Sequence, residues 1–549
     1  MRKTITLSEQ EATLRQLLLD VSNYIGTLDG HSRPQLRFTG GWVRDKLLGV
    51  GSKDIDIAID SMTGYHFGML MKQYLEQPDT QAKYPKSVKL SKIEANPDKS
   101  KHLETTTAHI MGLDIDLVNL RKETYTEHSR NPQMEFGTPQ DDAMRRDATV
   151  NAMFYHLDNS GIEDFTGRGF NDMERGLIKT PLSPYQTFKD DPLRVLRAIR
   201  FASRLGYSID PEDERAMSDP AIWEEFKLKI TRERVGIEIT KMLRGPNPRQ
   251  ALHLIDRLGL YKTIFTIPGS ESSPPGTALS NWQKAYDELQ TMVNVESEDF
   301  DGQNAMVIVK SILFNKSEEV YPMWLLCAFV PWARLGRPAP KKPGGVAPTL
   351  AKMSAQEGIK ADNDSAKLID NAASHLESII QARHAVIKEE STTNPLKRKQ
   401  DDVSRQEQGL FIREWGSNWR CSVMYAILTE ITESAPEQHH ELLEQYARWL
   451  STLKDLDLLE AYQLKPLVDG KKLTKEFETK DGPWVGKALK VIIAWQLRTP
   501  DNLSPEAAIC ENREQIQSLI QDGNHARPSD VNGERDGQKG KKKKQGKGT

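Results

Sequence analysis

Residues 54–60 read Asp-Ile-Asp-Ile-Ala-Ile-Asp, and this alternation constrains the fold more than any other segment. In a β-strand, successive side chains point to opposite faces. The isoleucines would then face a core, while Asp54 and Asp56 share the other face with Cα atoms roughly 6.5–7 Å apart. Neighbouring carboxylates repel each other unless a cation lies between them, and oxygen ligands suit Mg²⁺ held against a triphosphate. The segment predicts a strand with a metal site; an exposed polar strand face is the equal alternative.

A second alternating run, residues 113–121, offers a third carboxylate. Its apolar residues fall on one face of a strand, and Asp114 and Asp116 fall on the other. Either acid could join Asp54 and Asp56 in a site for two metal ions, and the spacing does not choose between them. An exposed strand face is again the equal alternative.

A glycine pair precedes the first acidic strand. Gly40 and Gly41 follow a short predicted strand, residues 36–39, and lead into a predicted helix, residues 42–48. Glycines at a helix N-terminus let phosphate oxygens approach the backbone N–H groups, and Arg44 lies one turn into that helix. An isolated glycine pair indicates an ordinary turn, but two glycines, a helix and an Asp-x-Asp strand in succession form a more specific unit.

Two arginine-rich segments follow. The first, residues 145–154, carries Arg145, Arg146, Asp147 and Asn151. A spacing of four residues predicts that Asp147 and Asn151 share a helix face. Arginine forks suit phosphate oxygens, and a paired carboxylate fixes their orientation. A surface ion-pair network is the alternative, and it is favoured when the segment is taken alone.

The second arginine-rich segment, residues 189–207, predicts a helix that begins at Pro192. Asp190 and Asp191 precede it, and its four arginines recur at steps of three and four residues to form one cationic stripe. Asp191 and Arg194 lie near the first turn, where an acceptor beside a fork donor matches what reading a base edge requires. A solvated helix face is the alternative.

The order of patterns along the chain predicts separate domains. Strand signals gather before residue 190, a glycine-rich segment at 164–181 predicts a turn-rich hairpin, and helical patterns dominate afterwards. Helical patterns cover residues 8–28, 191–205, 232–243, 251–258, 366–389, 421–432, 440–455 and 483–497. Polar stretches rich in helix breakers or charges predict linkers at residues 266–280, 336–349 and 390–409, and the lysine-rich end, residues 521–549, predicts a disordered basic tail.

Composition excludes several protein classes. The chain has 549 residues, enough for three or four domains of roughly 150 residues each. No uncharged apolar run approaches the ~18–20 residues of a membrane-spanning helix, and the first residues resemble neither a signal peptide nor a transit peptide. Three distant cysteines exclude a disulfide scaffold and a CxxC zinc site. The net charge of −3 means that any nucleic-acid-binding surface must be local.

Five ordered motifs within residues 36–245 resemble those of class II tRNA nucleotidyltransferases, the CCA-adding enzymes of bacteria and eukaryotes, and most closely the fungal type. The motifs are GGWVRD, DID, RRDATVNA, DFTGRGFNDM and DDPLRVLR. The resemblance implies an α+β fold, in which an N-terminal nucleotidyltransferase head with a mixed β-sheet and helices precedes all-α domains. The implied domains are a catalytic head (1–180), a nucleotide-selecting neck (181–265), a body (266–460), a tRNA-binding tail (461–520) and the disordered end (521–549).

The resemblance also assigns site residues. Asp54 and Asp56 match the family's catalytic metal ligands, and Asp116 matches its third acidic residue. Nucleotide-binding positions are implied for Gly40, Gly41 and Arg44 at the triphosphate, for Arg145, Arg146, Asp147 and Asn151 at phosphate and ribose, and for Asp190, Asp191, Arg194 and Arg197 in the amino-acid template that pairs with C or A. Asp190 stands where the family usually has Glu. Residues 233–243 match a helix that braces the template, and Lys471 and Lys472 are candidate tRNA contacts.

Such enzymes add C, C and A to the 3′ end of tRNA from CTP and ATP and release pyrophosphate by a two-metal mechanism with Mg²⁺. Side chains read the incoming base, so no nucleic-acid template is needed. The interval 61–107 lies where the family has a flexible loop associated with A addition. The resemblance further implies tRNA, CTP and ATP as partners, and activity in cytoplasm, nucleus and mitochondrion. The sequence does not determine the oligomeric state, for which a monomer is favoured.

Three alternatives stay open at this point. A related enzyme could add only CC or only A. A poly(A) polymerase shares the head motifs, although its arginine-rich segment after the head is not evident in this sequence. A catalytically silent RNA-binding paralogue belongs to a different class, and the pair of Asp54 and Asp56 counts against it because unused neighbouring carboxylates repel each other.

Overall fold

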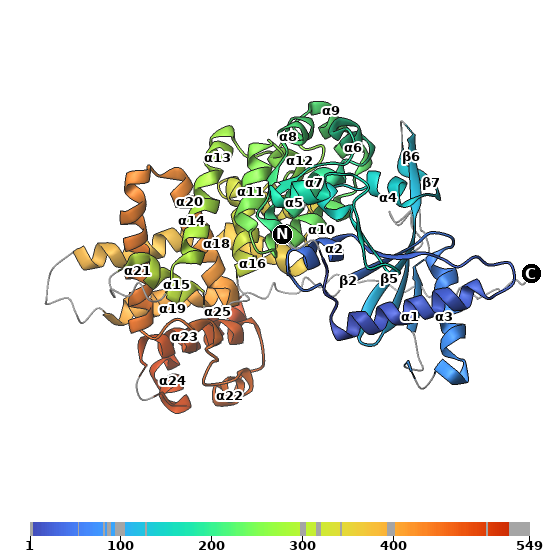
Figure 1. Cartoon of the computed structure of the whole chain (residues 1–549). Helices are drawn as coiled ribbons and strands as arrows, with labels where there is room; N and C mark the ends of the chain where they lie inside the picture. The colour runs from blue at the N-terminus through green and yellow to red at the C-terminus, as the bar shows by residue number, and fades with distance from the viewer. Residues whose placement is uncertain are drawn as a thin grey trace, which may run out of the picture. The chain divides into compact units, whose positions relative to one another are not determined.

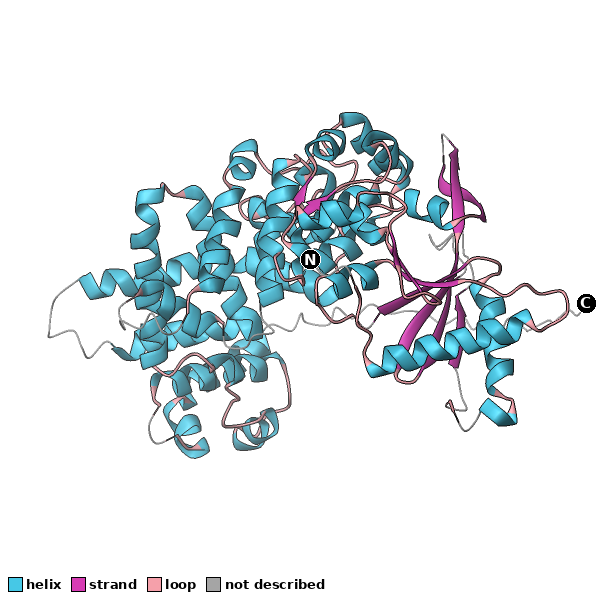
Figure 2. Cartoon of the chain, viewed as in Figure 1, coloured by secondary structure: helices cyan, strands magenta, loops and turns pink. Residues whose placement is uncertain are grey.

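The computed structural model describes residues 4–52, 54–80, 83–84, 89–93, 105–126, 129–296, 304–314, 320–340, 343–391, 401–500 and 503–525. Over these residues the chain forms two compact units, Met1–Glu377 with Arg420–Glu444 and Ser378–Trp419 with Gln445–Thr549. Figures 1 and 2 show that the described strands all belong to the first unit, whereas the second unit is helical. The predicted body, residues 266–460, therefore contributes helices to both units.

A seven-stranded mixed sheet forms the amino-terminal part of the first unit. Its strand order is β3-β4-β5-β2-β1-β8-β9. The strands are β1 (Leu36–Thr39), β2 (Asp54–Ile59), β3 (Lys89–Ile93), β4 (Thr105–Ile110), β5 (Leu113–Asn119), β8 (Phe154–His156) and β9 (Ile162–Glu163). The strands predicted from the glycine motif and from the two alternating acidic runs are confirmed as β1, β2 and β5.

The central strands bring the acids side by side. β2 runs parallel to β5, with Asp54 opposite Asp114 and Asp56 opposite Asp116. The three isoleucines of β2 are fully buried. Because paired residues of adjacent strands share a face, the four aspartates lie together on the face of the sheet that the isoleucines avoid.

Two helices pack on the sheet. α1 (Glu9–Gly26) contacts β1 and α3, and α3 (Gly64–Leu75) contacts β4 and β5; Figure 1 shows the two helices alongside the strands. α3 buries Phe67 and Met71, which are four residues apart and so share a helix face. The interval 61–107, expected to hold a flexible loop, thus contains α3, a short 3₁₀ turn, β3 and the start of β4; residues 81–82, 85–88 and 94–104 lie outside the described residues.

The segment after β5 departs from the sequence prediction. A separate hairpin of β6 (Arg121–Thr126) and β7 (Ser129–Phe136) precedes α4 (Pro139–Met144). The helix predicted for the first arginine-rich segment is wrong, because α4 ends at Met144 and only a short 3₁₀ turn, Thr149–Asn151, follows. Asp147 and Asn151 therefore do not share a helix face.

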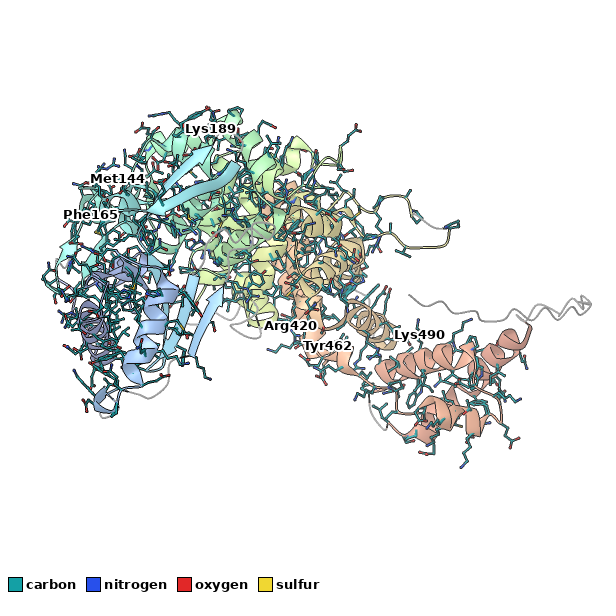
Figure 3. The ribbon with its side chains drawn as sticks, turned by 90° about the vertical axis from the view of Figure 1, so that its right-hand side faces the viewer. Met144, Phe165, Lys189, Arg420, Tyr462 and Lys490 are labelled. Carbon is teal, nitrogen blue, oxygen red and sulfur yellow. The ribbon has the colours of Figure 1, made fainter. Side chains whose placement is uncertain are left out.

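The hairpin predicted over residues 164–181 is also wrong. The segment forms α5 (Gly169–Glu174) and β10 (Leu177–Ile178), and β10 pairs in parallel with the distant β11 (Ser208–Ile209) instead of with a neighbouring strand. Phe165, labelled in Figure 3, packs edge-on against Phe154 of the sheet with 5.9 Å between ring centroids.

The rest of the first unit is helical. Its helices are α6 (Pro184–Asp190), α7 (Leu193–Leu205), α8 (Pro211–Met217), α9 (Pro220–Lys229), α10 (Arg232–Leu243), α11 (Pro248–Arg257), α12 (Tyr261–Ile264), α13 (Gly276–Ser280), α14 (Trp282–Asn294), α15 (Ala305–Leu313), α16 (Val320–Ala328), α17 (Leu350–Gly358), the first part of α18 (Asn363–Ser391), most of α20 (Trp419–Glu433) and the start of α21 (His439–Asp455). The helical patterns predicted in this region are confirmed, and the predicted linker at 266–280 ends in the short helix α13.

The second unit comprises the remaining turns of α18 and α21 together with α19 (Asp401–Trp415), α22 (Gly470–Glu476), α23 (Pro483–Arg498), α24 (Pro505–Glu511) and α25 (Arg513–His525). α19 begins inside the predicted linker 390–409, and α25 extends five residues into the predicted disordered end. The lysines at 397 and 399 and the lysine-rich end after residue 525 lie outside the described residues. Trp484, Ile492 and Trp495 of α23 form the centre of the unit's core.

Two expectations from composition can be compared with the structure. Cys327 and Cys421 are buried free thiols, and Cys510 is an exposed one, so the chain has no disulfide. Among the described residues, no helix combines the length and the hydropathy that crossing a membrane requires.

Gly236 of α10 gives a test of this packing. A Cβ atom at Gly236 would lie 1.9 Å from the carbonyl oxygen of Ile359, which follows α17. We expect Gly236→Ala to destabilise the first unit by about 3 kcal/mol or more, because backbone must move to admit the methyl group. Chemical unfolding measures the change. Gly276→Ala, at the start of α13 with nothing within 4 Å of its Cβ, is the matched control and should cost nothing; equal losses in both variants would contradict the packing.

Candidate functional site

The acidic face of the sheet gathers the predicted metal ligands. Asp54 is exposed, and Asp56 and Asp116 are partly buried. Burial raises the pKa of Asp56 to about 6, and the charges of Asp54 and Asp116 add to the rise against the opposing effect of Arg146. Thr107 of β4 donates a hydrogen bond of 2.7 Å to Asp116 Oδ1. Asp56 and Asp116 therefore form the inner pair of this face.

The other aspartate of β5, Asp114, is more exposed and has a different hydrogen-bond partner. Asp114 lies 2.7 Å from His109 Nδ1 through its Oδ1 atom, and its side chain is 76% exposed. Spacing alone did not distinguish Asp114 from Asp116, and the family resemblance favoured Asp116. The strand register sets Asp116 beside Asp56 and Asp114 beside Asp54, the first residue of β2.

The acidic face fits a divalent cation by its chemistry. In the described part of the chain, no three His, Cys, Asp or Glu side chains converge as closely as the ligands of a bound metal do. The donors are nevertheless hard carboxylate oxygens, and mutual repulsion contributes to the raised pKa of Asp56. A cation between Asp54, Asp56 and Asp116 would relieve that repulsion, and Mg²⁺ leaves positions for water and phosphate oxygens.

The glycine pair lies directly against this face. Gly40 caps α2 (Gly41–Leu47) with φ 75° and ψ −141°, a backbone region open essentially only to glycine. A Cβ atom at Gly40 would lie 2.9 Å from Asp56 Oδ2 and 3.4 Å from a terminal nitrogen of Arg146. The glycine thus lets the acidic strand, the helix N-terminus and an arginine meet at one point.

Arg44 does not extend into open space. Its side chain is 2% exposed, donates to Asp45 Oδ1 from Nε at 2.8 Å and from a terminal nitrogen at 2.6 Å, and also donates to Asn151 Oδ1. The structure therefore joins Arg44 to Asn151, two predicted site residues from distant segments, within a buried cluster behind the glycine pair.

The arginine pair that follows α4 is anchored on one buried acid. Both Arg145 and Arg146 bond to Asp142, whose side chain is 2% exposed. Burial favours the neutral acid, but the two arginines outweigh this effect and hold the pKa of Asp142 below its usual value. Arg146 also donates to Thr39 Oγ1 at 2.7 Å, next to the glycine pair. The surface-network alternative is thus replaced by a buried network beside Asp56.

α7 carries the predicted arginine stripe, and each of its four arginines pairs with a carboxylate from a different element. The pairs are Arg194 with Glu123 of β6 at 3.7 Å, Arg197 with Asp147, Arg200 with Glu238 of α10 at 2.6 Å, and Arg204 with Asp45 of α2 at 3.1 Å. The stripe is therefore a set of ion pairs that tie α7 to other segments of the first unit, which we call the arginine ladder.

The predicted template residues lie where α6 meets α7. Asp191 accepts a hydrogen bond from the backbone N–H of Leu193 at 3.2 Å, and its other oxygen lies 3.5 Å from Arg234 of α10. Burial raises the pKa of Asp190, which accepts a hydrogen bond from Gln186. α10 thus contacts the predicted template segment through an ion pair, and its bracing role stays a prediction.

The sequence analysis assigned a role to Asp147 but none to the other acids that hold these arginines. Asp45 and Glu238 fall inside segments that had been singled out, but Asp142 and Glu123 do not. A search for acids close in sequence to the arginine motifs would have identified Asp142, three residues before Arg145. The contacts of Glu123 with Arg145 and Arg194 could not be predicted from the sequence, because these arginines lie in distant segments.

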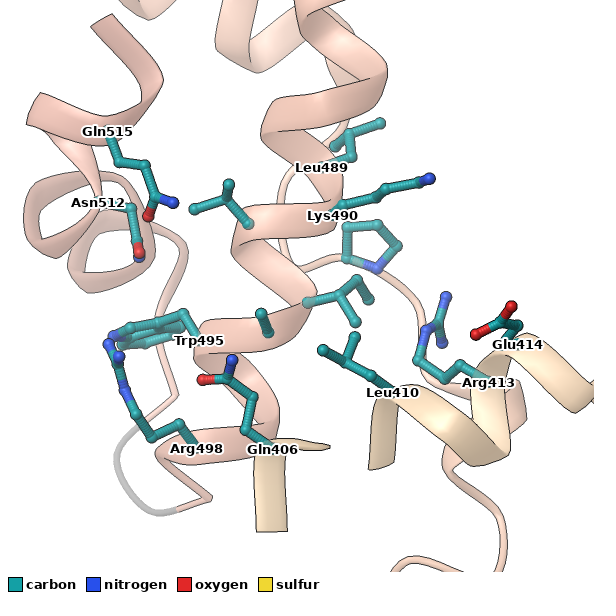
Figure 4. A pocket seen from close by; sticks show the side chains of 14 residues that line it. Gln406, Leu410, Arg413, Glu414, Leu489, Lys490, Trp495, Arg498, Asn512 and Gln515 are labelled. Carbon is teal, nitrogen blue, oxygen red and sulfur yellow. The ribbon is translucent and has the colours of Figure 1, made fainter. Parts of the chain in front are cut away.

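The second unit holds the candidate tRNA contacts. Lys471 and Lys472 are exposed on α22, and Lys472 forms an ion pair with Glu506 at 2.9 Å. A groove of about 860 Å³ lies between α19, α23 and α25 (Figure 4). Lys471 and Lys472 are not among the residues that line it. Three cations, Arg413, Lys490 and Arg498, contribute to its walls. The carboxylate of Glu414 also lines the groove, so its walls carry a net positive charge, which the sequence analysis did not predict.

Comparisons with known proteins agree on the family. Residues 36–179 match the model of the poly A polymerase head domain, and residues 206–272 match a model described as the probable RNA and SrmB-binding site of polymerase A. The chain is 38% identical to "Nucleotidyltransferase lcsQ" of Purpureocillium lilacinum, over 93% of this chain and 92% of that protein. It is 37% identical to "CCA tRNA nucleotidyltransferase, mitochondrial" of Saccharomyces cerevisiae, over 91% of this chain and 92% of that protein.

The fold has solved counterparts. A structure titled "The structure of CCA-adding enzyme apo form II" covers 93% of this chain and 96% of its own length with a TM-score of 0.59. The sequence identity is 18%, so the likeness supports the fold alone. This likeness confirms the predicted fold class, in which a head with a mixed sheet is followed by helical domains.

The close approach at Gly40 generates a prediction. We expect Gly40→Ala to lower the free energy of unfolding by about 2–3 kcal/mol, because the new methyl group meets Asp56 and the backbone conformation excludes other residues. Urea unfolding measures the loss. Gly30→Ala is the control: it has φ 78° but nothing within 4 Å of its Cβ, and should cost about 1 kcal/mol. Equal losses would show that Gly40 does not touch the acidic strand.

Proposed function

Because this chain belongs to the nucleotidyltransferase family that includes the yeast CCA tRNA nucleotidyltransferase, we propose that it adds C, C and A in turn to the 3′ end of tRNA. CTP and ATP are the substrates, and each addition releases pyrophosphate. One observation carries the proposal: the arginine ladder ties the helix of Asp191 and Arg194 to the segments that surround Asp56. A base-reading pair and an acidic, phosphate-compatible face thereby belong to one site.

The acidic face is the proposed metal site. Asp54, Asp56 and Asp116 would hold two Mg²⁺ ions, and bound ions would supply the Lewis acidity that activates the tRNA 3′-hydroxyl and neutralises the departing pyrophosphate. Gly40 and Gly41 leave room for phosphate oxygens at the start of α2. Arg146, fixed by Asp142 and Thr39, contributes positive charge beside the triphosphate.

Asp191 and Arg194 are the proposed readers of the base. C and A each present an amino group beside a ring nitrogen, so a carboxylate acceptor and a guanidinium donor can bond to both. U and G present a carbonyl oxygen where C and A have the amino group. This oxygen is an acceptor and would be repelled by the carboxylate of Asp191. Arg197 and Asp147 brace this pair from within the ladder. Residues 1–180 and 181–265 would thus act as catalytic head and nucleotide-selecting neck.

The second unit is the proposed tRNA-binding part. Lys471, Lys472 and the cationic groove would contact phosphates and so position the tRNA without reading its sequence. The name of the yeast relative places that protein in mitochondria. We propose the same compartment for this chain, with cytoplasm and nucleus as further sites of action. A monomer satisfies every role proposed above.

One assay tests the activity and separates the alternatives. Purified protein is incubated with Mg²⁺, labelled CTP or ATP, and tRNA ending at nucleotide 73, 74 or 75. The proposal predicts two C additions, then one A, then termination. The family model that matches the head is that of the poly A polymerase head domain. Long A tails would therefore support poly(A) polymerase activity instead. Addition of only C or only A would indicate a partial enzyme, and no incorporation would contradict the proposal.

Substitution of single acids tests the assignment of the metal site. We expect Asp56→Asn and Asp116→Asn each to lower turnover at least about 10³-fold, the loss of several kcal/mol of charge stabilisation. tRNA affinity should stay within a few fold, as measured by filter binding. Asp114→Asn is the matched control on the same strand and should leave turnover within a few fold. A large loss in Asp114→Asn with a small one in Asp116→Asn would reverse the assignment.

A further inference from the structure

Glu123 occupies a junction that no motif covers. It lies on β6, and its side chain is 6% exposed. Three arginines lie close to its carboxylate: Arg121 of the same strand, Arg145 just after α4, and Arg194 of α7. A carboxylate this buried, with this many cationic neighbours, is fixed in position by them.

The two oxygens of Glu123 face different parts of the molecule. Oε1 lies 3.1 Å from Arg121 Nε and accepts a hydrogen bond of 3.0 Å from Arg145. Oε2 lies 3.7 Å from a terminal nitrogen of Arg194. One oxygen therefore anchors the carboxylate in the head, and the other reaches the proposed base-reading arginine of the neck.

The surroundings of Glu123 are rich in positive charge. Arg121, Arg145, Arg146 and Arg194 share two buried acids, Glu123 and Asp142, in the contacts described above. The pKa of Arg121 falls to about 10 because burial and the charge of Arg145 both disfavour its cationic form. A triphosphate bound beside this cluster would attract any arginine on a flexible side chain.

Arg194 is the arginine for which this attraction matters. Its guanidinium must face a base to read it, yet a long side chain near phosphate oxygens would be drawn toward them. A buried carboxylate on the other side of the guanidinium opposes that pull. The Asp191 carboxylate does not serve this purpose, because it lies beside Arg234 and caps the start of α7.

We propose that Glu123 is a positioning residue that holds Arg194 toward the incoming base and away from the triphosphate, so that base choice depends on a carboxylate of the β6–β7 hairpin. The inference rests on the proposed function and deepens it by adding a specificity determinant outside the five motifs. Glu123 touches no reacting atom, and its effect passes through Arg194.

The test uses Glu123→Gln in the full chain, with tRNA ending at nucleotide 73 and each of CTP and UTP as substrate. We expect the ratio of kcat/KM for CTP to that for UTP to fall about tenfold, within the range that one base contact contributes to discrimination. The KM for CTP should change less than kcat, because the triphosphate contacts remain. Glu135→Gln, an exposed acid on β7 opposite Lys122, is the matched control and should leave the ratio unchanged.

A double-mutant cycle separates positioning from a merely structural role. In an Arg194→Ala background, Glu123→Gln should not lower the C-to-U ratio any further, because the residue through which it acts is already gone. A further loss of the same size as in the wild-type background would overturn the inference. So would an unchanged ratio in the single variant.

Two controls cover a variant that does not fold and a wild-type protein that is inactive. If Glu123→Gln does not fold, Glu123→Asp keeps the charge at a shorter reach, and its C-to-U ratio should fall between wild type and Arg194→Ala; a ratio equal to wild type would overturn the inference. Wild-type protein is assayed in parallel. A wild type that adds no nucleotide defeats the proposed function, whereas an active wild type with an indifferent Glu123 defeats only this inference.

Discussion

The arginine ladder of α7 is the interaction on which the rest of the site depends. Four arginines on one helix each find a carboxylate on a different element, so the helix is held in a fixed rotation and height relative to β6, α2, α10 and the turn after α4. Ion pairs of this kind contribute little net stability, since desolvation offsets much of the attraction. Their value lies in orientation, because the four pairs join α7 to four different segments.

The ladder also connects the acidic strands to the segment proposed as the nucleotide template. Asp45 joins α7 to the helix that follows the glycine pair, and Asp147 joins it to the turn that carries Arg146. Arg146 in turn lies within contact of Gly40 and lowers the pKa of Asp56 against burial and like charge. Ion pairs and electrostatic interactions thus link the helix proposed to read the base to the carboxylate proposed to hold metal.

Much of the fold follows from sequence patterns, and much of the site does not. Alternation of isoleucine and aspartate predicts β2 because burial on one face imposes period two, and apolar residues at steps of three and four predict α7 and α10. The hairpin of β6 and β7 escapes prediction because its strands are mostly polar and show no regular alternation of apolar and polar residues. Asp114 and Asp116 look equivalent by spacing, and only the family resemblance separates them in sequence; the parallel register then sets Asp116 beside Asp56. The pairing of the ladder could not be predicted, because pairs such as Arg194 with Glu123, or Arg204 with Asp45, are made by tertiary structure.

A crystal structure of the protein with Mg²⁺ and a non-hydrolysable CTP analogue tests the central claim most directly. The account predicts that the amino group and ring nitrogen of cytosine lie within hydrogen-bond distance of the Asp191 carboxylate and the Arg194 guanidinium. It also predicts that the triphosphate lies against the face of β2 and β5 that carries Asp56 and Asp116. A nucleotide bound elsewhere, or a cytosine that contacts neither Asp191 nor Arg194, would contradict the account.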